Sequence, residues 1–230
     1  MRRNGQVLVF DADDTLWENN ILFERVIEDF LTWLDHPTLD RVQARAVLDR
    51  IQAANAVAHG YGSGMLLRSL ADCVAELRGG PATAQQRAEI EAMASVLSHT
   101  RVELIAGVAE TLDVLGRRHD LLLLTKGDPR EQRRKVDASR LAHHFRAVDI
   151  VAEKDVETYH RLVETHALDP ARSWMIGNSP KSDILPARQA GMNAVFVPNR
   201  HTWVLEHTEL DPQDDRVIQL RSFSELLEHF

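Results

Sequence analysis

The sequence has a single cysteine, Cys73, so no disulfide can form within the chain. It also has no excess of basic residues, because 27 Lys and Arg stand against 35 Asp and Glu and give a formal net charge of −8. This balance argues against a nucleic-acid polymer or an anionic membrane as partner, since both require a basic surface. The N-terminal residues lack the apolar stretch of a signal peptide, and no apolar run approaches membrane-spanning length. We therefore expect a cytoplasmic protein.

Length and composition are those of an ordinary globular protein. The chain has 230 residues, of which 44% are hydrophobic and 27% are charged, so extensive disorder is not expected. This length suits one large domain, or a core domain with a smaller domain inserted in it. The eleven histidines show no zinc-like spacing, so nothing in their pattern indicates a zinc site.

The chain is organised around a short apolar run, Val7–Phe10, that ends in the cluster Asp11-Ala-Asp13-Asp14-Thr15. Four consecutive apolar residues are typical of a strand buried on both faces of a parallel sheet. Burying carboxylates directly after such a strand is costly unless a cation or a reaction needs them. In open α/β sheets, ligands bind at the carboxyl ends of the strands. The pattern indicates a charged site that begins at Asp11, and the simpler alternative is an Asp-rich turn that caps a helix.

The next segment, residues 18–103, has the apolar spacing of helices throughout. Glycines at positions 60, 62 and 64 predict a turn in it, because glycine disfavours any regular element. Four helices joined by short breaks suggest a small antiparallel bundle. The helices are expected at 21–34, 38–58, from Met65 to Gly79, and at about 83–98.

From Gly107 onward, helices alternate with short apolar runs that predict strands at 121–124, 147–151, 173–176, 194–197 and, at an edge, 216–220. Such alternation implies a parallel sheet with right-handed crossovers. The predicted fold class is α/β: a doubly wound parallel sheet, a Rossmann-like core, with an inserted all-helical cap domain. The core would comprise residues 1–17 and 104–230, and the cap domain would comprise residues 18–103.

Polar residues that have no evident structural purpose follow four of these strands. Because a parallel sheet brings the ends of its strands to one edge, these groups should converge. Phosphoryl transfer requires functional groups of these kinds: a carboxylate cluster, a hydroxyl and an ammonium. Asp11 could attack phosphorus and form an aspartyl-phosphate, while Asp13 could exchange protons with the leaving group and water. The groups are Asp11 with Asp13, Thr125, Lys154, and Asn178 with Asp183, of which the last two have oxygens suited to Mg²⁺.

These four motifs, in this order, resemble those of the haloacid dehalogenase superfamily. Asp11-Ala-Asp13-Asp14-Thr15 resembles the first motif, Thr125 the second, Lys154 the third and the segment Gly177–Asp183 the fourth. The resemblance implies a Mg²⁺-dependent phosphatase whose cap supplies much of the substrate specificity. It also implies that the carbonyl of Asp13 binds the metal. The expected catalytic residues are Asp11, Asp13, Thr125 and Lys154, the substrate-binding residues Thr125, Lys126 and Lys154, and the metal ligands Asp11, Asp13, Asn178 and Asp183.

Several alternatives stay open at this point. The chain could be a phosphomutase, a dehalogenase or a phospho-accepting signalling module, although dehalogenases lack the second aspartate that Asp13 provides. Asn178 stands where many relatives have an aspartate, so it either binds the metal or caps its loop. Lys126 either contacts a substrate anion or points to solvent. The turn Gly60–Gly64 either reaches into the site or only joins two helices. The expected substrate is a small phosphorylated metabolite, such as a sugar phosphate, phosphoglycolate or a nucleoside monophosphate, bound by a monomer or homodimer.

Overall fold

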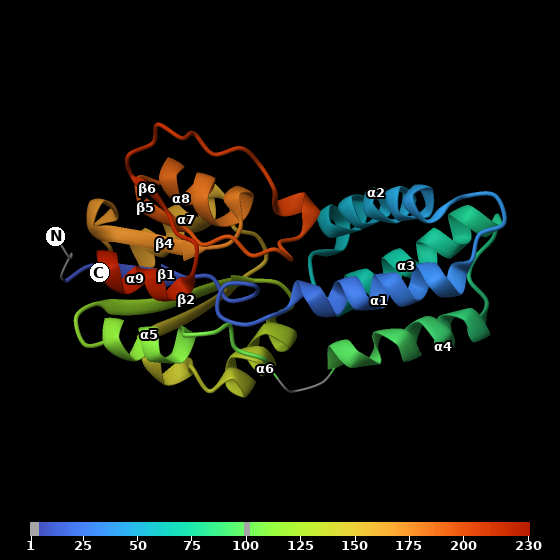
Figure 1. Cartoon of the computed structure of the whole chain (residues 1–230), viewed down its shortest axis with the longest axis horizontal. Helices are drawn as coiled ribbons and strands as arrows, with labels where there is room; N and C mark the ends of the chain where they lie inside the picture. Colours follow the sequence, from blue (N-terminus) through green and yellow to red (C-terminus); the bar gives the residue numbers. More distant parts are fainter. Residues whose placement is uncertain (1–4, 99–101) are drawn as a thin grey trace. The chain divides into compact units, whose positions relative to one another are not determined.

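The structure, a computed structural model, describes residues 5–98 and 102–230 and contains a six-stranded sheet (Figure 1). The strand order is β3-β2-β1-β4-β5-β6, and every neighbouring pair is parallel. This topology confirms the doubly wound α/β fold, including the edge position of the last strand. The strands are β1 (Val7–Phe10), β2 (Asp120–Lys126), β3 (Ala147–Val151), β4 (Ser173–Gly177), β5 (Asn193–Phe196) and β6 (Val217–Gln219).

Helices cover both faces of the sheet. Successive residues of each strand point to opposite sides, so an apolar strand such as β1 has apolar side chains on both faces for helices to bury. Leu8 and Phe10 of β1 belong to one apolar core, which α5, α6 and α9 complete. Val9 belongs to a second core on the other face, with Tyr159 of α7 and Ala187 of α8. Figure 1 shows α5 and α6 on one side of the sheet and α7 and α8 on the other. The helices are α5 (Val108–Leu115), α6 (Pro129–Ser139), α7 (Val156–Thr165), α8 (Leu185–Gln189) and α9 (Leu226–His229).

The register of the sheet places the ends of its strands together. Phe10, the last residue of β1, is paired with Leu123 of β2 on one side and with Ile176 of β4 on the other. The residues that follow these strands therefore leave the sheet at the same edge, as the strand-end argument predicts.

The chain divides into two compact units, Met1–Asn20 with Arg101–Phe230, and Ile21–Thr100. The described part of the second unit is helical and has its own apolar core, which includes Phe30, Leu48 and Leu70. Its helices are α1 (Asn20–Leu34), α2 (Arg41–His59), α3 (Ser63–Arg78) and α4 (Ala84–Met93), followed by a 3₁₀ turn at Ala94–Ser98. No helix within the described residues has the length and apolarity needed to cross a membrane.

Two local expectations in this unit were wrong. Gly64 was expected in a turn, but it lies inside α3, because that helix already begins at Ser63. A glycine is tolerated there because the amides of the first helical turn have no partner within the helix in any case. The fourth helix is also shorter than the expected span 83–98, since the chain tightens into the 3₁₀ turn after Met93.

Candidate active site

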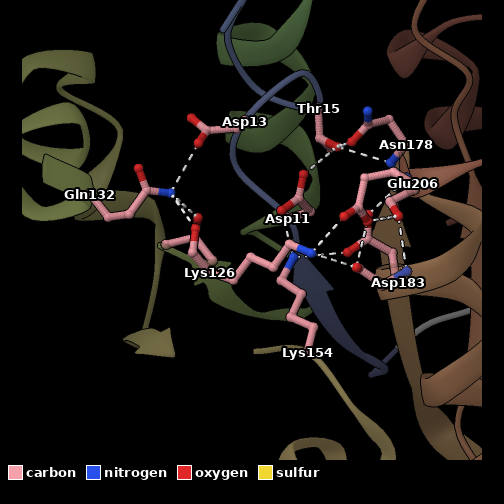
Figure 2. Close-up of polar contacts among 12 residues, drawn as sticks. Asp11, Asp13, Thr15, Lys126, Gln132, Lys154, Asn178, Asp183 and Glu206 are labelled. Atoms are coloured by element: carbon pink, nitrogen blue, oxygen red, sulfur yellow. Dashed lines mark hydrogen bonds and ion pairs between the residues drawn. The ribbon is translucent and has the colours of Figure 1, made fainter. Parts of the chain in front are cut away.

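Three charged side chains meet at the carboxyl edge of the sheet: Asp11, Lys154 and Asp183 (Figure 2). Asp11 directly follows β1, and Lys154 follows β3. The Nζ atom of Lys154 lies 2.5 Å from Oδ1 of Asp11 and 2.8 Å from Oδ1 of Asp183. All three residues are buried, with exposed fractions of 7%, 3% and 1% for Asp11, Lys154 and Asp183. The strand ends thus bring together residues that are up to 172 positions apart in the chain, from 11 to 183.

The burial of this cluster changes the proton affinity of its members. Burial raises the pKa of Asp11 to about 7; the ammonium of Lys154 opposes this rise, and the neighbouring Asp183 adds to it. Burial by itself would lower the pKa of Lys154, but the carboxylates of Asp11 and Asp183 raise it above its ordinary value. The two carboxylates therefore favour the protonated form of Lys154, which bonds to both of them.

A tight loop over residues 12–17 fixes the orientation of Asp11. The Leu16 amide donates to the carbonyl of Ala12 at 2.8 Å, and Asp14 adopts a positive φ of 62° in the middle of the loop. This loop carries Thr15 back toward the sheet, where its hydroxyl donates to Oδ2 of Asp11 at 2.8 Å. Asp11, the predicted nucleophile, is therefore held at both of its carboxylate oxygens, by Thr15 at Oδ2 and by Lys154 at Oδ1.

Asp13 points away from Asp11, toward α6, as Figure 2 shows. Nε1 of Trp17 donates to its Oδ1 at 2.7 Å, and Nε2 of Gln132 donates to its Oδ2 at 3.0 Å. Nζ of Lys135 lies 3.1 Å from Oδ1 and 2.9 Å from Oδ2. The two aspartates that sequence analysis paired thus lie in different environments, because each one is bonded by its own set of donors.

The end of β2 supplies Thr125 and Lys126. The hydroxyl of Thr125 is buried and accepts from Nε2 of Gln132. The ammonium of Lys126 lies 2.7 Å from Oε1 of Glu206 and 2.8 Å from Oγ of Ser182, and it also reaches Glu153 at 3.4 Å. Lys126 therefore neither ends in solvent nor joins the group around Asp11, but lies in an ion-paired network beside it.

Glu206 is the carboxylate at the centre of this network. Its Oε2 accepts hydrogen bonds from the hydroxyls of Ser179 and Ser182, so it links the loop after β4 to the end of β2. Burial by itself would raise the pKa of Glu206, but Lys126 and the two serines lower it below its ordinary value. Glu206 is thus an anion that holds the loop carrying Asp183.

The side-chain amide of Asn178 lies between two sets of oxygens. The orientation that satisfies all of its partners turns its nitrogen toward Thr15 Oγ1, Asp13 O and Asp11 Oδ2, at 3.2, 3.2 and 3.3 Å. Its oxygen then accepts from the hydroxyl of Thr202 at 2.8 Å. Asn178 therefore adjoins two of the oxygens that were expected to hold the metal, and it also ties the strand-end loops together.

The fit of this site to a divalent cation rests on a mixed set of oxygens. Within residues 5–98 and 102–230, no group of three or more His, Cys, Asp or Glu side chains is arranged to hold a metal. The donors are instead two carboxylates, Asp11 and Asp183, with the carbonyl of Asp13 and the amide of Asn178 close by. Proteins commonly hold Mg²⁺ through one or two carboxylates, with water and phosphate oxygens completing the shell. Since the two buried carboxylates share one ammonium, a cation would also balance their remaining charge.

Sequence reasoning located every strand-end residue of this region but missed several residues that contact them. Gln132 and Lys135 come from the helix that follows Thr125, and Glu206 comes from the turn Val204–Glu206. Asp128 caps the N-terminus of that helix, because its side chain accepts from the amides of Arg130 and Glu131. The only signal for Gln132 and Lys135 is their spacing of three residues, which puts them on one helical face.

Comparisons with known proteins agree with the motif assignment. The phosphoserine phosphatase of Thermus thermophilus is 26% identical, over 84% of this chain and 88% of that protein. The human N-acylneuraminate-9-phosphatase is 23% identical, over 85% of this chain and 83% of that protein. The crystal structure of a haloacid dehalogenase-like hydrolase from Xanthomonas campestris has a TM-score of 0.80 and 27% identity, covering 96% and 92% of the two chains. Residues 6–191 match the sequence profile of the haloacid dehalogenase-like hydrolases, so this chain belongs to that family.

Proposed function

We propose that this protein is a phosphatase that hydrolyses a small phosphomonoester through an aspartyl-phosphate on Asp11, with Asp13 as general acid and base and Mg²⁺ as cofactor. The observation that carries the proposal is the contrast between two carboxylates two residues apart. Asp11 lies against Lys154 and Asp183, whereas Asp13 is bonded separately from α6 and by Trp17. Carboxylates in different environments can take different roles in one reaction. The names of the two phosphatase relatives support phosphoester hydrolysis as the reaction class.

In the first step, an oxygen of Asp11 attacks phosphorus and the bond from phosphorus to the alcohol oxygen breaks. Asp13 gives its proton to the leaving alcohol. The ammonium of Lys154 and the hydroxyl of Thr125 stabilise the charge on the phosphoryl oxygens. In the second step, water attacks phosphorus of the aspartyl-phosphate while Asp13 takes a proton from it, which regenerates Asp11 and releases inorganic phosphate.

Mg²⁺ would be held by Asp11, Asp183, the carbonyl of Asp13 and the amide oxygen of Asn178. When bound, the ion would offset the repulsion between the Asp11 carboxylate and an anionic phosphate. In the structure the Oδ1 atom of Asn178 faces Thr15 and its Nδ2 donates to Thr202, the orientation that a metal ligand needs; the reversed amide is the one that hydrogen bonds favour without a cation. Thr202 suits either orientation, because a hydroxyl both donates and accepts.

We also propose that the helical unit Ile21–Thr100 acts as the cap that selects the substrate. The argument is that the strand-end residues serve the phosphoryl group, which all candidate substrates share. Discrimination among alcohols must therefore come from residues outside that set. Both relatives' substrates, phosphoserine and an N-acylneuraminate 9-phosphate, belong in the first panel tested.

The test measures phosphate release from a panel of phosphomonoesters with and without Mg²⁺, for the wild type and Asp11→Asn. We expect metal-dependent release that Asp11→Asn abolishes while its circular dichroism spectrum stays unchanged. Retained turnover in a folded Asp11→Asn protein would overturn the mechanism. Isomerised ester without free phosphate would assign a phosphomutase instead, and halide release from 2-haloacids without phosphate release would assign a dehalogenase.

A further inference from the structure

Asp13 is held by two side chains on one face of α6 that the proposed chemistry does not use. Gln132 donates to its Oδ2 at 3.0 Å, and the Lys135 ammonium lies 2.9 and 3.1 Å from its two oxygens. Because residues three positions apart lie on the same side of a helix, both donors approach the carboxylate together. Figure 2 shows Gln132 facing Asp13 from the helix side.

Both side chains are themselves fixed by further contacts. Nε2 of Gln132 lies 2.5 Å from the hydroxyl of Thr125 and 3.0 Å from the carbonyl of Lys126, and the residue is 2% exposed. The ammonium of Lys135 contacts Oδ1 of Asn19 at 2.7 Å. A buried glutamine that serves an aspartate and a threonine at once couples the end of β2 to the loop after β1.

Gln132 belongs to the buried side of α6, which also places Val136 in the apolar core one turn later, whereas Lys135 is partly exposed. The side chain of Lys135 is 18% exposed and that of Asp13 is 23% exposed, so this pair borders solvent rather than the core. A partly exposed ion pair of this kind generally contributes little to stability. The contact of Lys135 with Asp13 therefore indicates a role in orienting the Asp13 carboxylate.

Resting on the proposed function, we propose that Gln132 and Lys135 are positioning residues for Asp13. They hold the plane of its carboxylate and tie it to the hydroxyl of Thr125, so that the proton donor and the phosphoryl-binding hydroxyl keep one mutual geometry. Proton transfer depends steeply on such geometry, because donor and acceptor must be within hydrogen-bond reach in the transition state. Removing the lysine should harm the protonation of the leaving group more than the binding of the phosphate.

The test uses a series of substituted phenyl phosphates whose leaving phenols differ in acidity but little in size. A p-nitrophenolate leaves without a proton, whereas a phenolate without the nitro group depends on one. We expect Lys135→Met to lower kcat/KM by ~10–100-fold for phenyl phosphate, a share of the usual general-acid effect, and by much less for p-nitrophenyl phosphate. Lys135→Arg should restore most of the loss, and Gln132→Met should act in the same direction as Lys135→Met.

Two controls separate positioning from a structural role. Arg134→Met removes a cation from an exposed position of the same helix and should leave the series unchanged. In an Asp13→Asn background, Lys135→Met should cost almost nothing further if the lysine acts through Asp13. An equal loss for all phenyl phosphates, or a rise in KM alone, would overturn the inference, the latter by showing that Lys135 binds the substrate. Activity that survives Asp11→Asn would refute the proposed function itself, which is a separate outcome.

Discussion

A Cβ atom on Gly177 would lie 2.1 Å from Oδ2 of Asp183 and 2.4 Å from its Cγ. No real side chain tolerates such an approach, so the last residue of β4 has to be glycine for Asp183 to lie where it does. The same Oδ2 accepts from the Ser179 amide at 2.9 Å, while Oδ1 faces Lys154 at 2.8 Å. The position of this carboxylate is therefore set by the backbone beneath it as much as by its charged partner.

Gly177→Ala should consequently disable the site more than it destabilises the fold. The added methyl must displace the Asp183 carboxylate or the strand end, which costs about 1–3 kcal/mol of unfolding free energy, as overpacking generally does. We expect phosphate release to fall by at least ~100-fold, because small misplacements at an active site have effects of this size. Urea unfolding and phosphate assays measure both effects. Gly80→Ala is the matched control, since a Cβ there meets nothing within 4 Å, and wild-type turnover in Gly177→Ala would contradict the argument.

Asn178→Asp should strengthen Mg²⁺ binding. The amide adjoins Asp11 Oδ2 and Asp13 O at 3.3 and 3.2 Å, so a carboxylate in its place would add a charged oxygen to the expected ligands. We expect the Kd for Mg²⁺ to fall by ~10-fold, equivalent to about 1.4 kcal/mol, and the melting temperature without metal to fall because like charges then crowd together. Calorimetric titration with Mg²⁺ measures the first effect and thermal unfolding in EDTA the second.

Asp183→Asn makes the opposite change in charge at the same site and should weaken Mg²⁺ binding. An unchanged or weaker affinity in Asn178→Asp would mean that the amide serves only to tie its loop to Thr15 and Thr202.

The strand-end residues could be predicted because a parallel sheet imposes two simple rules. Its strands are buried on both faces, so they read as unbroken apolar runs such as Val7–Phe10 and the leucines of β2. Their ends share one edge, so the polar residue after each run is placed without knowing the tertiary structure. Asp11, Lys154 and Asp183 meet in space because they follow strands that end at this edge, and Gly177 and the Ser179 amide then set the position of Asp183.

The partners of those residues could not be predicted, because they depend on distances that no local pattern encodes. Glu206 is 80 positions from Lys126 and lies in a loop without periodicity. Gln132 and Lys135 read as ordinary polar residues of an amphipathic helix. The conformation of Gly64 also escaped prediction, since whether a glycine begins a helix or interrupts it depends on the packing of the following residues.

Removing the charge of Glu206 should loosen the fold. Its carboxylate is bonded to Lys126 at 2.7 Å and to the hydroxyls of Ser179 and Ser182, and only 9% of its side chain is exposed. Breaking one side of a buried ion pair leaves the other charge poorly compensated. We expect Glu206→Gln to lower the unfolding free energy by about 2–4 kcal/mol in urea denaturation.

The double variant Glu206→Gln/Lys126→Met gives the internal control, because it removes both charges. It should be less destabilised than the sum of the two single variants. Strict additivity would show that the ion pair contributes nothing and that the serine contacts alone hold the loop.

Asp14 should make the stability of the protein depend on pH. It is 7% exposed, and its carboxylate accepts from the amides of Asn19 and Asn20 at 3.0 Å, where α1 begins. Burial nevertheless raises the pKa of Asp14 to about 7 from its ordinary 3.8. The folded protein therefore holds a proton at pH values where the unfolded chain has lost it. This contribution to stability is complete below about pH 4 and disappears as the pH rises through 7.

Asp14→Asn stays neutral at every pH, and its amide oxygen can still accept from both backbone amides. Relative to the wild type, its unfolding free energy should therefore rise between pH 4.5 and pH 8, by up to ~3–4 kcal/mol at about 1.4 kcal/mol per pKa unit. Urea unfolding in EDTA at pH 4.5, 6 and 8 measures this difference without interference from bound metal. Asp35→Asn changes an exposed aspartate that also has a positive φ, and it should show no comparable trend. A constant difference between Asp14→Asn and the wild type across this range would mean that Asp14 is ionised in the folded protein throughout, with its two amide hydrogen bonds outweighing its burial.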